Sequence, residues 1–183
     1  MSSPDATIGY ITVVDQERTG WTGGLLILSR GGRPLEFQCT LPVRPSKAHT
    51  ILFGPSLRDH LIADVITPVL IKRVRTKISI IAVDQPETLR LAETTDVPVV
   101  LVVDAAEAAE GPIGDEELAG WPSIEFSGAT VRCTPEDEPE VRRLAQQMSD
   151  LPDAAEPFGR ITQAIAEAHS QIARGQINQS KAA

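Results

Sequence analysis

The stretch IGYITVVDQERTGWTGGLLILSRGGRPLEFQCTL, residues 8–41, decides the fold. It contains three runs rich in β-branched and aliphatic residues, at 8–15, 23–29 and 35–41, separated by polar or glycine-rich turns. Such runs between turn residues are typical of β-strands. Gly31 and Gly32 suit a tight hairpin turn, because glycine accepts positive φ. The stretch therefore predicts an antiparallel three-strand meander.

Two details of this stretch carry further expectations. Glycines lie at positions 20, 23 and 24, and we expect them to serve the first hairpin turn alone, because the segment lacks the lysine and the following helix of a phosphate-binding loop. The third strand alternates strictly, which predicts that one face is buried and the other is wet. Its apolar positions are Leu35, Phe37, Cys39 and Leu41, and its polar ones are Glu36, Gln38 and Thr40.

Helical signals follow the meander. Pro42 and Pro45 end the sheet, and Ser46 is a plausible helix cap. Apolar residues between 57 and 70 then recur at the spacing of one helix face. Pro68 lies inside this pattern and predicts a kink, because proline cannot donate the helical hydrogen bond.

The second half alternates strands and helices. Continuous apolar runs at 78–83 and 97–103 flank a short helix at 87–93, which is typical of a parallel strand pair with a crossover. Residues 105–123 are expected to form a surface loop or a partly helical excursion, and 124–133 one more strand. A helix should start at Thr134-Pro135, and a last one should run from Pro157 to about Gly175.

We therefore predict an α/β (α+β) fold. A three-strand antiparallel meander is followed by a kinked helix, then by alternating strands and helices, with C-terminal helices packed on the sheet. Residues 1–175 are expected to form a single domain, and residues 176–183 a flexible polar tail.

Composition narrows the class of protein. The formal net charge of −8 argues against a general nucleic-acid coat protein, which needs a basic surface. No apolar run approaches membrane-spanning length and no signal peptide is evident, so a soluble cytoplasmic protein is expected. Cys39 and Cys133 are far apart in apolar stretches and are expected to be buried free thiols.

Aspartates stand at the ends of predicted strands and on the kinked helix. Asp15 closes the first strand and Asp84 follows the fourth, while Asp59 and Asp64 lie on the helix between. The order of elements from Ile8 to Val103 resembles that of the ribonuclease-H-like family, although no family sequence motif surrounds these residues and the helix offers Asp where the family has Glu.

The resemblance implies a metal site. In that family, carboxylates of the first strand, first helix and fourth strand hold two divalent cations that act on a phosphodiester. Here Asp15, Asp59 or Asp64, and Asp84 would hold Mg²⁺ or Mn²⁺, with Asp15, Asp64 and Asp84 as the catalytic set. The structural alternative is that these aspartates form turns and cap helices.

A second group of residues suggests a contact surface. Arg44, Lys47 and His49 gather at the junction of the meander and the first helix, and Trp21 lies at the mouth of a hairpin. Trp and Arg are enriched at interface hot spots. The favoured prediction is a non-enzymatic protein-interaction or accessory module without a cofactor, which binds a protein partner or itself and no membrane. The alternative is a metal-dependent ribonuclease-H-like phosphodiesterase, and only this alternative involves nucleic acid.

Overall fold

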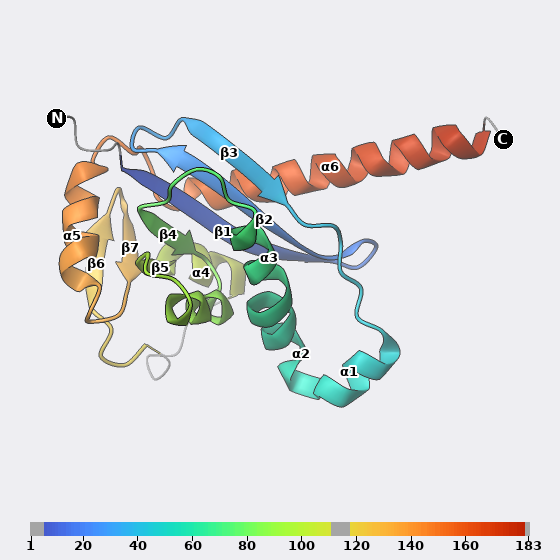
Figure 1. Cartoon of the computed structure of the whole chain (residues 1–183), viewed down its shortest axis with the longest axis horizontal. Coiled ribbons are helices and arrows are strands. Elements are labelled where there is room, and N and C mark those ends of the chain that lie inside the picture. Colours follow the sequence, from blue (N-terminus) through green and yellow to red (C-terminus); the bar gives the residue numbers. More distant parts are fainter. Residues whose placement is uncertain (1–5, 111–117, 182–183) are drawn as a thin grey trace.

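The computed structural model describes residues 6–110 and 118–181. It confirms the mixed α/β class: a seven-stranded sheet with helices packed on both faces (Figure 1). The strand order across the sheet is β3-β2-β1-β4-β5-β7-β6. The strands are β1 (Thr7–Gln16), β2 (Gly20–Ser29), β3 (Pro34–Cys39), β4 (Ile80–Val83), β5 (Val99–Val102), β6 (Ser123–Phe126) and β7 (Ala129–Arg132).

The meander is formed by β1, β2 and β3, which pair antiparallel in chain order. β4 then pairs parallel to β1, and β5 pairs parallel to β4. The predicted parallel pair with its crossover is therefore confirmed, as is the order of a meander, a helical stretch and alternating strands and helices. β4 and β5 are apolar on both faces because helices cover both faces of the sheet.

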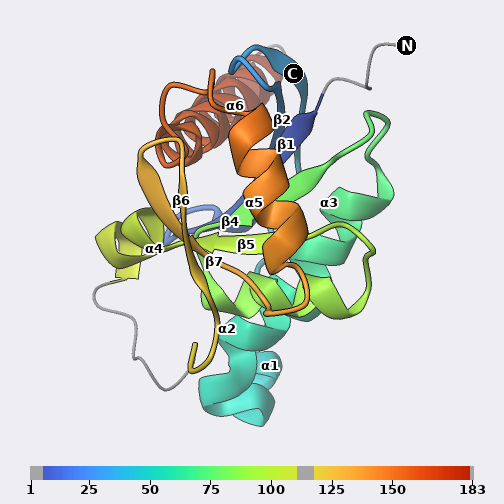
Figure 2. The ribbon, with the colours of Figure 1, turned by 90° about the vertical axis from the view of Figure 1, so that its left-hand side faces the viewer.

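One face of the sheet is covered by the two C-terminal helices, α5 (Glu138–Gln147) and α6 (Glu156–Lys181). The side chains of Val141 and Leu144 on α5 and of Phe158, Ile161 and Ile165 on α6 pack into this core cluster. Figure 2 shows both helices on the same side of the strands. The expectation of C-terminal helices packed on the sheet is confirmed.

The opposite face is covered by helical segments between the strands. Ile62, Ile66 and Leu70 belong to one core cluster with apolar residues of β1 and β2, and the same cluster contains Leu91 and Ala106 with apolar residues of β4 and β5. The segments are α1 (Lys47–Phe53), η1 (Gly54–Ser56), α2 (Leu57–Asp59), η2 (His60–Ile66), α3 (Thr67–Lys72), η3 (Pro86–Glu93) and α4 (Val103–Glu110).

The kinked helix has an identifiable cause. α3 begins at Thr67, directly before Pro68, and the preceding segment η2 is π-helical. The Thr67 backbone N–H bonds the Ile62 carbonyl, five residues back. Because Pro68 cannot donate a hydrogen bond and its ring crowds the carbonyl four residues earlier, the chain widens here instead of continuing as a regular α-helix.

Gly23 and Gly24 do not serve the turn, contrary to our expectation. Both lie within β2, and a Cβ at either would meet a helix side chain on opposite faces of the sheet. At Gly23 it would lie 2.2 Å from Ile66 Cγ2, and at Gly24 2.2 Å from Ile161 Cγ2. Both helical layers therefore approach the backbone of β2, which only glycine allows.

The prediction that the apolar face of β3 is buried is wrong. Leu35 and Phe37 are 47% and 41% exposed, and the Cys39 side chain is exposed as well. β3 is an edge strand, and α6 packs on its neighbour β2 and on β1, the strand beyond β2. The apolar side chains of β3 therefore lie beyond the part of the sheet that the described helices cover. Cys133 is buried, as expected.

Three boundaries also differ from prediction. The single strand expected at 124–133 is a hairpin of β6 and β7, in which Ser127 and Gly128 take φ of 45° and 81°. The helix expected at Thr134 begins at Glu138, because the Thr134 hydroxyl bonds the Asp137 backbone and forms a separate turn. α6 continues to Lys181, past the predicted end at Gly175.

In the described part of the chain, no helix combines the length and the apolar character that crossing a membrane requires.

Candidate functional site

The carboxyl ends of the parallel strands β1 and β4 form the first candidate site. Their register pairs Ile11 with Val83, so that Thr12 and Asp84 follow side by side. The Thr12 hydroxyl donates to Asp84 Oδ2 over 2.8 Å, and both side chains are buried. A carboxylate is thus held inside the protein at the sheet end where ligands of open α/β folds usually bind.

Gln85 fixes the backbone next to this carboxylate. Its Oε1 accepts from the Val13 N–H and its Nε2 donates to the Val13 carbonyl, each over 2.9 Å. The side-chain amide therefore replaces a backbone partner for β1 beyond the end of β4. The Asp84 backbone is consequently held between two anchored neighbours, Val83 in the sheet and Gln85.

Arg58 brings a positive charge to the same end of the sheet. From α2, its Nε donates to Glu87 Oε1 over 2.6 Å, and its guanidinium carbon lies 5.9 Å from the centre of the Trp21 ring. Glu87 Oε2 is buried and accepts no hydrogen bond within the described residues. We call Thr12, Arg58, Asp84, Gln85 and Glu87 the carboxyl-edge cluster.

The other aspartates considered from the sequence lie apart from Asp84. Asp15 is exposed and stands three residues beyond Thr12, about 10 Å further along the strand and on the opposite face. Asp59 and Asp64 form ion pairs with Arg90 of 2.8 and 3.0 Å, and Asp64 also pairs with His60 at 3.0 Å. Asp104, after β5, accepts the Thr130 N–H at 2.7 Å and joins α4 to β7.

These carboxylates do not fit a two-cation centre. Within residues 6–110 and 118–181, no three side chains of the types His, Cys, Asp and Glu lie close enough together to hold a metal ion. Asp84 lies at the end of β4, where the resemblance places a carboxylate. Its neighbour on β1, however, is Thr12, and Asp59 and Asp64 form ion pairs with Arg90.

The four residues considered for binding follow one another along a second surface. The backbone of Trp21 bonds that of Val43 in both directions, which places Arg44 beside the β1–β2 turn. Arg44 donates to the carbonyls of Arg18 and Thr19. Lys47 and His49 follow in α1, where the Ser46 hydroxyl caps the helix by accepting the His49 N–H at 3.2 Å.

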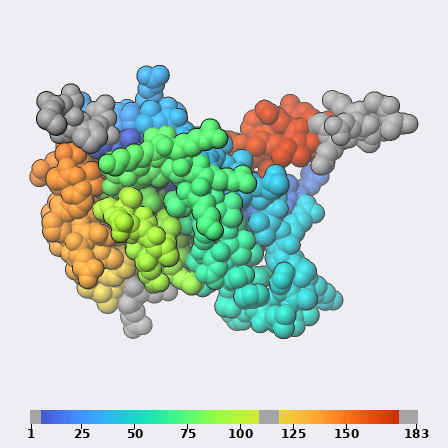
Figure 3. Space-filling model, in the orientation of Figure 1, coloured from blue at the N-terminus to red at the C-terminus, as the bar shows by residue number. Residues whose placement is uncertain are grey.

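Aromatic rings continue this surface. Phe53 stacks on His60 with ring centres 4.2 Å apart and an angle of 14°, and His49 meets the edge of Phe53 at 6.3 Å. α1 buries none of its residues, and Figure 3 shows the segment projecting from the body at the lower right. We call the following residues the arm surface: Trp21, Arg44, Lys47, His49, Phe53, Arg58 and His60.

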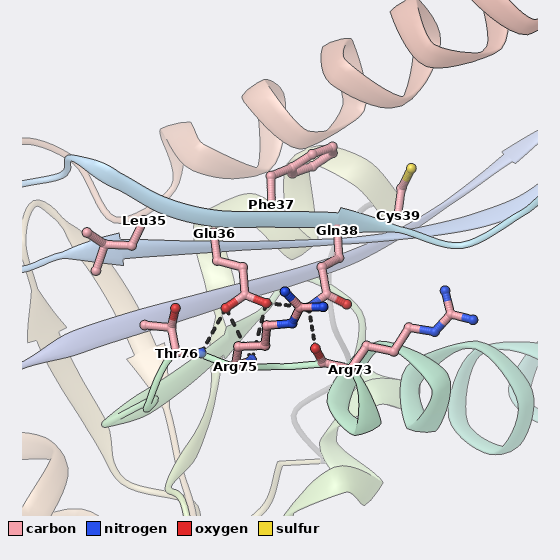
Figure 4. Close-up of a pocket in the computed structure, with 8 residues that line it drawn as sticks. All are labelled: Leu35, Glu36, Phe37, Gln38, Cys39, Arg73, Arg75 and Thr76. Atoms are coloured by element: carbon pink, nitrogen blue, oxygen red, sulfur yellow. Dashed lines mark hydrogen bonds between the residues drawn. The ribbon is translucent and has the colours of Figure 1, made fainter.

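A separate hollow of about 830 Å³ runs along β3 and the segment from Arg73 to Thr76 (Figure 4). Its carboxylate, Glu36, accepts the backbone N–H groups of Arg75 and Thr76 at 3.2 and 2.8 Å. Desolvation alone would raise the pKa of Glu36, but the hydrogen bonds from Thr76, Gln38 and Arg75 outweigh it and lower the pKa to about 2. The hydrogen-bonded carboxylate of Glu36 thus holds the segment from Arg73 to Thr76 against β3.

Searches of protein-family models and of curated proteins find no match to this chain. Thirteen chains of solved structures match. One is Endonuclease V of Ciona intestinalis, in complex with a 23mer DNA containing an inosine followed by a ribo-adenosine. It is 10% identical, with a TM-score of 0.43, over 92% of this chain and 87% of that chain.

This finding corrects the functional prediction. The favoured expectation, a non-enzymatic protein-interaction or accessory module, is contradicted because the matching structure is an endonuclease on DNA, which agrees better with the alternative. A likeness of this degree assigns neither a fold family nor an activity to this chain, so the function is proposed from its own residues.

Proposed function

We propose that this protein acts on nucleic acid, which it contacts through the arm surface and the adjoining carboxyl edge of the sheet. The observation that carries the proposal is the joining of cations and aromatic rings along one stretch, from Arg44 and Lys47 to the Phe53–His60 stack. Cations neutralise backbone phosphates and rings stack on bases, which together bind single strands without a sequence code.

The local charges support this assignment despite the net charge of −8. The ion pairs of the described residues include neither Arg44 nor Lys47. Arg44 donates to backbone carbonyls and keeps its positive charge uncompensated. The acids of the neighbouring helices are engaged instead: Asp59 and Asp64 pair with Arg90.

Trp21 joins the two parts of the site. Its half-buried ring lies under the Arg58 guanidinium of the carboxyl-edge cluster, and its backbone pairs with the chain leading to α1. A strand that follows the arm surface would therefore reach Arg58 and Glu87, next to the carboxyl end of β4. We do not propose hydrolysis by two divalent cations, because no three His, Cys, Asp or Glu side chains of the described residues lie close enough together to hold a metal ion.

The test is a binding titration of fluorescently labelled single-stranded RNA, single-stranded DNA and duplex DNA, followed by anisotropy at two salt concentrations. The double variant Arg44→Ala, Lys47→Ala should weaken binding by about tenfold or more and flatten the salt dependence by about two phosphate contacts. Phe53→Ala should weaken single-strand binding by about tenfold with the salt dependence unchanged.

The matched control is Arg30→Ala, Arg33→Ala, which removes the same charge at the opposite end of β2. Both arginines are exposed, so folding should be unaffected. Equal loss of affinity in both double variants would mean that only net charge matters, and no binding of any of the three nucleic acids would overturn the proposal.

A further inference from the structure

The position on β1 that faces Asp84 decides what the carboxyl edge can bind. Thr12 occupies it, is 3% exposed, and gives its hydroxyl hydrogen to Asp84 Oδ2. A cation shared between β1 and β4 at this level needs oxygen ligands from both strands, and carboxylates are the usual ones. A threonine hydroxyl that donates toward the carboxylate points its hydrogen where a cation would lie.

Asp15, the one carboxylate within β1, cannot take the place of Thr12. Asp15 lies on the far face of β1, about 10 Å along the strand from this level. The guanidinium of Arg58 lies beside Trp21 and Glu87, so the protein itself supplies a cation there.

We infer that the carboxyl edge, as the described residues form it, is built to work without a pair of divalent cations: Thr12 occupies the place on β1 where a second carboxylate would complete a cation site with Asp84. The protein then contacts nucleic acid without requiring Mg²⁺ or Mn²⁺; this last statement rests on the proposed function, whereas the absence of a cation pair does not.

The inference is tested by restoring the missing ligand. Wild type, Thr12→Asp, Thr12→Asn and Asp84→Asn are titrated with Mn²⁺ alone in a calorimeter, and their melting temperatures are measured in EDTA and in millimolar Mn²⁺. Thr12→Asp should melt lower in EDTA, because the new carboxylate and that of Asp84 would be buried side by side, and Mn²⁺ should raise its melting temperature by about 5 °C or more. Thr12→Asn, of the same shape without the charge, should show no such rise.

Wild type should give no saturable heat with millimolar Mn²⁺. Saturable binding by wild type that Asp84→Asn removes would overturn the inference, and so would a folded Thr12→Asp that binds no Mn²⁺. If Thr12→Asp does not fold, the comparison of wild type with Asp84→Asn still decides. A separate measurement tests whether nucleic-acid binding requires a divalent cation. The dissociation constant for nucleic acid in EDTA should match that in Mg²⁺ within about twofold at equal ionic strength. An affinity present only with Mg²⁺ would overturn it, whereas no affinity in either buffer is a failure of the proposed function.

Discussion

Thr12 and Asp84 are joined by a buried hydrogen bond of 2.8 Å across a separation of 72 positions in the chain. The bond connects the first strand of the meander to the first parallel strand, at the end of the sheet where the candidate site lies. A buried carboxylate is costly unless it is hydrogen-bonded. The pair is thus expected to matter for stability as well as for what the edge can bind.

Thr12→Val keeps the side-chain shape and removes the hydroxyl, so Asp84 loses this donor. The free energy of unfolding is expected to fall by about 2 kcal/mol, measured by urea denaturation. Thr12→Ser keeps the hydroxyl and should lose less. Equal stability of Thr12→Val and wild type would show that the carboxylate does not depend on this bond.

Gly24→Ala should destabilise the protein by about 2 kcal/mol or more, because the new Cβ would lie 2.2 Å from Ile161 Cγ2 on α6. Thermal unfolding measures the loss. The control Gly31→Ala, with nothing within 4 Å of the new Cβ, should change stability by less than about 0.5 kcal/mol.

A double variant tests whether the close approach of the new Cβ at position 24 to Ile161 causes the loss of stability, rather than the replacement of glycine itself. Combining Gly24→Ala with Ile161→Ala removes the closest atom, Ile161 Cγ2, and the double variant should be destabilised by less than the sum of the two single losses. Strict additivity would mean that the contact between β2 and α6 is not the cause.

The meander and the parallel pair could be predicted from sequence because hydrophobic patterning and turn residues are local signals. The site could not, because it depends on register. Because Asp15 carries the carboxylate at the end of the first strand, the sequence alone favours Asp15 as the partner of Asp84. Only the pairing of Ile11 with Val83 determines that Thr12 faces Asp84. The residues of β1 alone do not predict its register with β4.

The exposed face of β3 was missed for a related reason. Its alternation correctly predicted a strand with unlike faces, but whether the apolar face is covered depends on where α6 crosses the sheet, which is a long-range property. The Ser127-Gly128 turn differs: a serine-glycine pair between apolar runs is a local hairpin signal, so this turn is predictable from the sequence.

Low pH should weaken the hydrogen bonds between the Glu36 carboxylate and the segment from Arg73 to Thr76. The pKa of Glu36 is lowered from 4.5 to about 2 in the folded protein, so its stabilising effect is present above about pH 4.5 and is lost as the pH falls toward 2. The stability difference between wild type and Glu36→Gln should therefore shrink between pH 5 and pH 2, as followed by urea denaturation. Glu107→Gln, the same change at an exposed position, is the control; an equal shrinkage there would contradict the assignment to Glu36.

The two cysteines should differ sharply in reactivity, because only one is reachable by solvent. Cys39 is exposed on the edge strand β3. Cys133 is buried, and desolvation, with smaller contributions from Asp137 and Glu138, raises its pKa to about 11. Since the thiolate is the reactive form, native protein near pH 8 should release about one equivalent of thionitrobenzoate from Ellman's reagent rapidly, and a second only after unfolding in guanidinium. Cys39→Ser should abolish the rapid phase and Cys133→Ser should leave it intact. Two rapid equivalents from native protein would show that the core around Cys133 opens far more readily than its packing between the sheet and α5 implies.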